Sequence, residues 1–258
     1  MDFLPRGSVS ASKAWSKVLD SIGPNATDPG RRNRFGGGIT TLKLVYPLFQ
    51  QFGEASLALR TLVHTDRSPS LGYMTVEGSS RTTLHEAYDM ASAYAGTWVG
   101  SFNHIMLGSP GQWFYTLFAG IDRAPSAQEG GFRTWSRLVL APPHGQDLWD
   151  QLKSCSGVLQ TPVGRVEVSW EIGNHSNAGG VLFEMEVNVP VNARAKVTVP
   201  TVVQADSVDV FEGQMLVWRK GLFVPGVPGI DAGTSGPQSR TIDFFVGSGH
   251  FLFSVAGV

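Results

Sequence analysis

The stretch "GRVEVSWEI", residues 164–172, decides the fold class of the second half of the chain. Val166, Val168 and Trp170 fall at every second position, and polar residues occupy the positions between them. A period of two places alternate side chains on opposite faces of a β-strand. The stretch therefore predicts a strand with one buried and one solvated face, which is typical of an antiparallel sheet.

Seven further segments of the second half show the same period and are bounded by Gly, Pro, Asn or Asp. They are residues 135–142, 181–189, 193–201, 207–213, 214–221, 241–249 and 250–257. No helical period interrupts them, so residues 132–258 predict an antiparallel β-sandwich of about eight strands. We expect no helix longer than two turns within residues 160–258.

The first half has helical spacing instead, and four helices are predicted at residues 10–23, 40–53, 54–65 and 103–121. The apolar face of the first comprises Ala14, Val18, Leu19 and Ile22. Pro47 must be absorbed in the second helix as a kink or a break. The fourth helix is interrupted at residues 108–110, which read Gly-Ser-Pro.

The chain is thus predicted to be of the α+β multidomain class, with an all-α part at residues 10–123 and an all-β part at residues 132–258. Residues 124–131 are the predicted linker. Residues 1–9, which contain "LPRGS", resemble an expression tag or a disordered start and are set aside.

Composition excludes several classes of protein and site. The 258 residues carry a net charge of −1, so no overall field favours nucleic acid or an anionic membrane. No apolar run reaches the length of a signal peptide or a membrane span, which predicts a soluble protein of undetermined compartment. Cys155 is the single cysteine and the six histidines are scattered, so neither a disulfide nor a metal site is expected.

Several motifs in order carry a resemblance to a known family. "TTLHEAYD" (residues 82–89) is similar to the "TT-x-W-E-x-x-D" segment of bacterial-type α-L-rhamnosidases, glycoside hydrolase family 78. "GSFNHIMLGSPGQWFYTLFAGI" (residues 100–121) resembles their "SxNHxxxGxxGxWxYxxxAGI" helix. "VGSGHFLFSV" (residues 246–255) resembles part of the β-sandwich that closes these enzymes. The resemblance runs from about Gly36 to the C-terminus.

The resemblance implies the last helices of an (α/α)₆ six-hairpin barrel followed by the C-terminal sandwich. The family's general acid lies in an earlier segment, and nothing before Gly36 resembles that segment. The chain therefore resembles the C-terminal part of a longer enzyme. A barrel sector without its partners should expose an apolar face, for which the candidates are Leu42, Val45, Leu48, Leu57 and Leu62.

The resemblance also implies the roles of individual residues. Glu86 matches the general base of an inverting glycosidase, which needs one carboxyl as acid and a second as base. His104 and Asp89 match family residues near the sugar. Asp89 is equally well explained as a turn-stabilising residue, and Asn103 is read as a helix N-cap. His85 stands where the family has Trp, which weakens the apolar platform.

Aromatic residues in the long loops are further candidates for substrate binding, and Trp98 and Tyr73 rank first. We expect the loop from Thr83 to His104 to return on itself. Glu86, Asp89 and His104 would then face one concavity, with Trp98 or Tyr73 on its wall.

Two functions remain open. The first is an inverting α-L-rhamnosidase that carries the general base, lacks the general-acid segment and acts on terminal rhamnose of glycosides or polysaccharides. The second is a non-catalytic module that binds carbohydrate or supports another chain. Neither needs a cofactor, and the expected protein partners are the missing N-terminal part or a second copy. Sequons at Asn25 and Asn174 leave glycosylation undecided.

Overall fold

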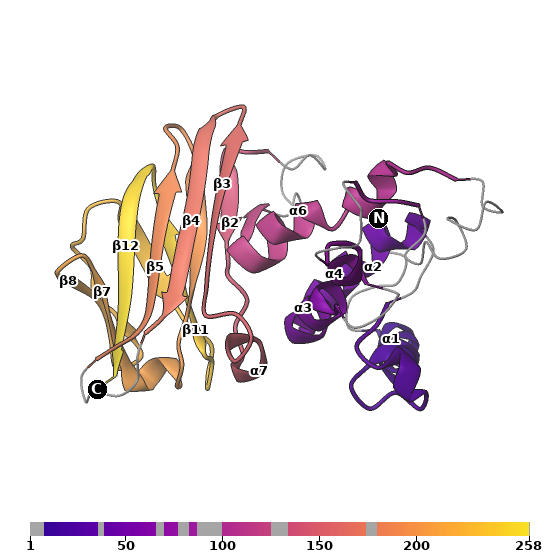
Figure 1. The fold of residues 1–258 in the computed structure, drawn as a ribbon. Helices are drawn as coiled ribbons and strands as arrows, with labels where there is room; N and C mark the ends of the chain where they lie inside the picture. Colours follow the sequence, from indigo (N-terminus) through magenta and orange to yellow (C-terminus); the bar gives the residue numbers. More distant parts are fainter. Residues whose placement is uncertain are drawn as a thin grey trace. The chain divides into compact units, whose positions relative to one another are not determined.

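The computed structural model describes residues 8–35, 39–65, 70–76, 83–86, 100–124, 134–173 and 180–257. Packing divides the chain into two compact units, Met1–Trp113 and Phe114–Val258. The first is helical and the second is built mostly of strands (Figure 1). The predicted order of helices followed by antiparallel sheets is confirmed. The predicted linker at 124–131 lies almost wholly outside the described residues, and the domain bounds that depend on it stay a prediction.

The helices of the first unit agree with three of the four predicted segments. They are α1 (Val9–Ile22), α2 (Ile39–Gln51), α3 (Ala55–Val63), α4 (Leu71–Met74) and α6 (Gly111–Trp113), with 3-10 turns η1 (Pro29–Arg31) and η2 (Ile105–Gly108). The Ser8 hydroxyl accepts a hydrogen bond from the Ala11 N–H at 3.1 Å and so caps α1. Pro47 lies on the exposed side of α2, and the helix continues through it.

The buried face of α1 differs from the predicted one. Ala11, Trp15 and Ile22 are buried, whereas Ala14 is exposed. The Trp15 ring meets Phe49 of α2 edge-on and stacks on Phe52, just after α2, at 4.8 Å between centroids. The predicted face is confirmed for Ile22 and is wrong for Ala14, while Val18 and Leu19 are partly buried. The prediction missed Trp15, whose large indole ring takes the centre of the contact.

The apolar face that the sequence predicted to be exposed is mostly buried within this chain. Leu42, Val45, Leu57 and Leu62 have exposed fractions of 1%, 8%, 0% and 6%. Only Leu48, at 37%, is exposed as expected. The prediction is wrong for four of the five residues, since the helices of the first unit cover one another's apolar sides.

The predicted helix at residues 103–121 is broken into three pieces. The turn η2 and the short helix α6 are followed by a π-helix, η3 (Phe114–Ala119), which belongs to the second unit. The break between η2 and α6 lies at Ser109 and Pro110, as the sequence predicts.

The second unit contains two sheets among its described residues. The five-stranded sheet has the order β1-β2-β6-β11-β10, and the seven-stranded sheet has the order β3-β4-β5-β12-β7-β8-β9. Every pair is antiparallel except β2 with β6. The strands are β1 (Ile121–Arg123), β2 (Arg137–Leu140), β3 (Ser154–Thr161), β4 (Gly164–Ile172), β5 (Val181–Val189), β6 (Arg194–Pro200), β7 (Val208–Glu212), β8 (Met215–Arg219), β9 (Leu222–Phe223), β10 (Ile230–Thr234), β11 (Thr241–Val246) and β12 (Gly249–Gly257).

All eight predicted strands are present. Besides the strands and the π-helix η3, the described part of this unit has a short helix α7 (Gln146–Trp149) and a 3-10 turn η4 (Ala205–Ser207). The turn η4 is the one helical segment among the described residues of 160–258, which confirms the expectation for that range. None of the helices that the structure describes is both long and apolar enough to cross a membrane.

The inner faces of the two sheets form the core of the second unit. Phe244 of β11 stacks on Phe253 of β12 at 5.1 Å, which joins the five-stranded sheet to the seven-stranded one. Trp170 of β4 is 2% exposed, and its indole N–H donates to the Phe118 carbonyl at 2.8 Å. This bond fixes the π-helix η3 to the seven-stranded sheet.

The indole bond to η3 predicts an unequal response of two buried tryptophans. Trp170→Phe removes the donor to a buried carbonyl, and we expect it to lower the free energy of unfolding by about 1–3 kcal/mol beyond the loss of packing. Trp149→Phe is the matched control. Trp149 is 4% exposed, and its indole nitrogen has no hydrogen-bond partner among the described residues. Urea unfolding followed by far-UV circular dichroism measures both, and equal losses would contradict the role of the bond.

The burial found in the first unit predicts a contrast between two leucines. Leu57→Ala, at a fully buried site, should lower the free energy of unfolding by about 2–5 kcal/mol through the cavity it leaves. Leu48→Ala makes the same chemical change at a partly exposed site and should cost much less. If thermal unfolding shows equal losses, the apolar face at Leu48 is covered in solution as well.

Candidate active site

The candidate site is formed where residues 83–86 lie against residues 100–104 of the first unit. The Glu86 N–H donates to the Ser101 carbonyl at 2.9 Å, and the His104 N–H donates to the Leu84 carbonyl at 2.7 Å. The chain therefore returns on itself as expected, and the return brings Glu86 beside His104.

One oxygen of the Glu86 carboxylate is held in place. The Ser101 N–H donates to Oε2 at 2.9 Å, and Nδ1 of His104 lies 3.9 Å from the same oxygen. No described residue makes a hydrogen bond to Oε1. With a side chain 38% exposed, Glu86 keeps this second oxygen accessible to a water molecule or a substrate.

The His104 imidazole is more enclosed than the carboxylate. Its side chain is 20% exposed, and Nε2 is buried without a hydrogen-bond partner among the described residues. A buried imidazole nitrogen ordinarily has a partner, because an unmet polar group is costly. Among the described residues, Nε2 therefore has an unmet hydrogen-bonding capacity.

Two contacts with Phe102 fasten the segments to each other. The Thr83 hydroxyl donates to the Phe102 carbonyl. The His85 ring, 5% exposed, meets the Phe102 ring edge-on at 5.3 Å and 86°. His85 is thus packed inside the unit, so its side chain offers no exposed platform for a sugar.

The remaining predicted residues have different outcomes. Asp89 and Trp98 lie outside the described residues, so their roles stay predictions. Tyr73 is partly buried in α4, and none of the described contacts joins it to Glu86. The prediction that Asn103 caps a helix is wrong, because η2 begins at Ile105 and His104 is its N-cap residue.

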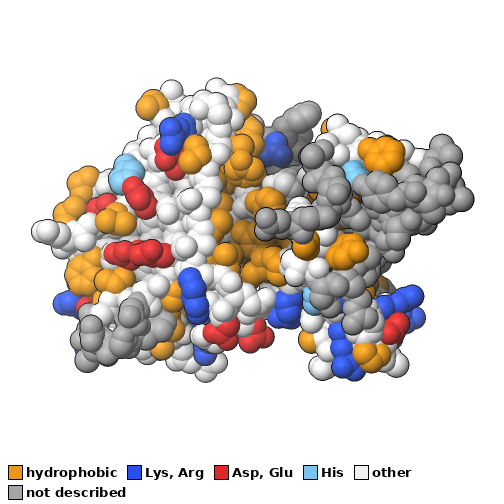
Figure 2. Space-filling model, viewed as in Figure 1, with side chains coloured by type: hydrophobic (Ala, Val, Ile, Leu, Met, Phe, Trp, Pro, Cys, Tyr) orange, Lys and Arg blue, Asp and Glu red, His pale blue; other side chains and the backbone are white. Residues whose placement is uncertain are grey.

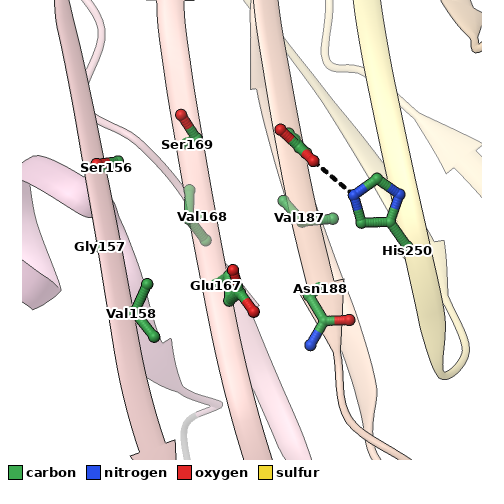
Figure 3. Close-up of a pocket in the computed structure, with 10 residues that line it drawn as sticks. Ser156, Gly157, Val158, Glu167, Val168, Ser169, Val187, Asn188 and His250 are labelled. Atoms are coloured by element: carbon green, nitrogen blue, oxygen red, sulfur yellow. Dashed lines mark hydrogen bonds and ion pairs between the residues drawn. The ribbon is translucent and has the colours of Figure 1, made fainter.

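A second polar site lies on the outer face of the seven-stranded sheet. Acidic side chains gather over this face in Figure 2. Figure 3 shows residues that line a hollow there, His250 among them. Nε2 of His250 lies 2.6 Å from Oε1 of Glu186. The other described lining residues are Ser156, Gly157, Val158, Glu167, Val168, Ser169, Val187 and Asn188. None of these is Trp, Tyr or Phe, so the described lining offers no aromatic ring on which a sugar could stack.

The described residues contain no group of three or more His, Cys, Asp or Glu side chains that could hold a metal ion. The described residues of the candidate site provide a fixed carboxylate with one open oxygen beside an imidazole. Such a carboxylate can accept a proton from water.

Comparisons with known proteins place the chain in a family. The bacterial α-L-rhamnosidase six-hairpin glycosidase domain matches residues 28–118, and the bacterial α-L-rhamnosidase C-terminal domain matches residues 120–214. The chain belongs to the bacterial α-L-rhamnosidase family. Glu86 and His104 both lie in the six-hairpin match.

Individual relatives agree with the assignment. An α-L-rhamnosidase of Formosa agariphila is 32% identical over 66% of this chain and 16% of its own length. One of Streptomyces avermitilis is 31% identical over 60% of this chain and 13% of its own length. The chain therefore spans about a sixth or less of the length of these two relatives.

Solved structures show the same fold. The α-L-rhamnosidase of Dictyoglumus thermophilum matches 98% of this chain and 24% of its own chain, with 26% identity and a TM-score of 0.72. The α-L-rhamnosidase of Aspergillus terreus matches 74% of this chain and 19% of its own, with 25% identity and a TM-score of 0.55. The rhamnosidase fold thus covers both units.

Sequence reasoning found Glu86 and His104 and missed the residues that hold them. Thr83 and Ser101 are small polar residues inside the two quoted motifs, and the resemblance gives neither of them a role. The signal that could have singled them out is their position, since each lies three residues before a predicted site residue.

Proposed function

We propose that the chain provides the general base of an inverting α-L-rhamnosidase and that Glu86 is that base. The observation that supports the proposal is that the Glu86 carboxylate is held in one orientation by a main-chain hydrogen bond. The Ser101 amide holds Oε2 at 2.9 Å, Oε1 is left open, and both segments lie in the six-hairpin match.

The reaction follows from the chemistry of inversion. Oε1 of Glu86 takes a proton from a water molecule, and the water oxygen attacks the anomeric carbon on the face opposite the leaving group. The bond from the anomeric carbon to the glycosidic oxygen breaks, and a second carboxyl group protonates that oxygen. The products are rhamnose of inverted configuration and the free alcohol.

The second carboxyl group belongs, in this proposal, to a part of the hairpin domain that the chain does not contain. The chain spans 24% of the Dictyoglumus thermophilum chain, so the acid would come from another part of the complete domain. Inverting enzymes separate the two carboxyl groups by about 6.5–9.5 Å.

His104 is the proposed first contact for the sugar. Its Nε2 is buried without a partner among the described residues, while Nδ1 faces the Glu86 carboxylate. A sugar hydroxyl would meet Nε2 and be held beside the base. Asp89, Trp98 and Tyr73 remain proposed members of the same substrate site, which would bind rhamnose-containing glycosides or polysaccharides.

The alternative is a non-catalytic carbohydrate-binding or supporting module. The sheet face offers a polar hollow for it, but the described lining holds no Trp, Tyr or Phe. Sugar sites combine apolar or aromatic walls with a few polar groups, and the described lining of the sheet hollow lacks the aromatic part. The hydrolase is favoured instead by the Glu86 carboxylate, which the Ser101 N–H holds in one orientation.

Hydrolysis of 4-nitrophenyl α-L-rhamnoside tests the proposal. The assay uses the chain alone and the chain fused behind the preceding part of the Dictyoglumus thermophilum enzyme, which supplies the acid. We expect turnover only in the fusion, with the inverted anomer as the first product seen by NMR. Glu86→Gln should lower kcat about a hundred- to ten-thousandfold, because the change removes the base and keeps the shape.

Glu54→Gln is the matched control. Glu54 lies in the same unit and makes no side-chain hydrogen bond at the start of α3, so its replacement should leave kcat unchanged. A fusion that turns over equally well with Glu86→Gln would end the general-base assignment. Binding of L-rhamnose without turnover in an otherwise active fusion would favour the binding module.

A further inference from the structure

We infer that Thr83 is a positioning residue that sets the orientation of the Glu86 carboxylate and so makes Oε1 the proton acceptor. The inference rests on the proposed function of Glu86 and adds a residue to which neither the family assignment nor the motifs give a role. It follows from what holds Oε2.

The donor to Oε2 is a main-chain amide. The Ser101 N–H reaches Oε2 at 2.9 Å, while the Glu86 N–H returns a bond to the Ser101 carbonyl, also at 2.9 Å. The two residues therefore hold each other through a closed pair of hydrogen bonds in which the carboxylate replaces a carbonyl group. The position of Oε2 depends on how residues 100–104 lie against residues 83–86.

Thr83 is placed to control that contact. Its hydroxyl donates to the carbonyl of Phe102, the residue that follows Ser101. The ring of His85, two residues after Thr83, packs against the ring of Phe102. Phe102 is thus held both at its carbonyl and at its ring. These contacts fix the adjacent Ser101, whose N–H donates to the Glu86 carboxylate.

The consequence concerns the two carboxylate oxygens. Oε2 accepts from Ser101 and faces Nδ1 of His104 at 3.9 Å, so its lone pairs are directed into the loop. Oε1 is the oxygen left for water. Loss of the Thr83 hydroxyl would let the Ser101 amide move away and the carboxylate rotate, although Thr83 itself touches neither Glu86 nor the proposed sugar position.

The Ser101 amide proton reports this arrangement directly in the 258-residue chain. The proton of an amide that donates to a carboxylate resonates downfield. We expect the Ser101 amide proton to lose this downfield shift in Glu86→Ala, and its position in that variant is the reference for an amide without the carboxylate bond. Thr83→Val should move the Ser101 signal towards the reference position and speed its hydrogen exchange about fivefold, the factor for one net hydrogen bond. Thr83→Ser keeps the hydroxyl and should restore the wild-type signal.

Thr75→Val is the matched control. Thr75 is an exposed threonine of the same unit, and its hydroxyl donates to the Gly72 carbonyl at 3.0 Å without touching the loop. Its replacement should leave the Ser101 signal unchanged. Signals of α2 and α3, which lie in the same unit as Thr83, should stay in place and so show that each variant is folded.

Kinetics of the fusion enzyme separate positioning from a merely structural role. Thr83→Val should lower kcat about ten- to hundredfold, as for a misplaced catalytic group, with KM within about twofold of wild type. Thr83→Ser should recover most of the rate. If Glu86→Gln is inactive while Thr83→Val keeps either the wild-type Ser101 signal or the wild-type kcat, the positioning role is overturned and the proposed function stands. If Glu86→Gln is fully active, the proposed function itself fails.

Discussion

Main-chain amides and carbonyls that leave water must find partners, and this constraint organises both units of the chain. In the sandwich, the strands satisfy one another along two sheets. In the helical unit, the main-chain groups of residues 83–86 bond to those of residues 100–104, with one exception. The Ser101 amide uses the Glu86 carboxylate where a strand would use a carbonyl. The candidate site thus arises from the same requirement that builds the sheets.

Whether a strand could be predicted from the sequence depends on its place in the sheet. The eight strands found by their period of two all have a neighbouring strand on each side. The four strands that the period missed are β1, β3, β9 and β10, and these are the four edges of the two sheets. Three of these edge strands, β1, β9 and β10, have only two to five residues, which is too short to show a clear period of two. In β3, the run "SCSG" replaces apolar residues, and Gly157 leaves room for Ala119.

Helical faces were harder to predict than helices. The limits of α1 follow from Ser8 and Gly23, but its buried face is set by the ring of Trp15 against α2. Tyr46 and Phe49 of α2 also pack on Trp113, which is 4% exposed. The unit therefore buries its leucines around an aromatic cluster, and the expectation of an exposed apolar face failed because it gave these rings no role.

The candidate site shows a different limit of sequence reasoning. Glu86 and His104 could be named because they fall within motifs, whereas their mutual position depends on bonds that span fifteen residues. A main-chain donor leaves no trace at the position that supplies it, since any residue except proline carries the same N–H. The side chain at position 101 is therefore uninformative about the carboxylate. The information lies instead at Thr83 and His85, whose side chains decide where that amide points.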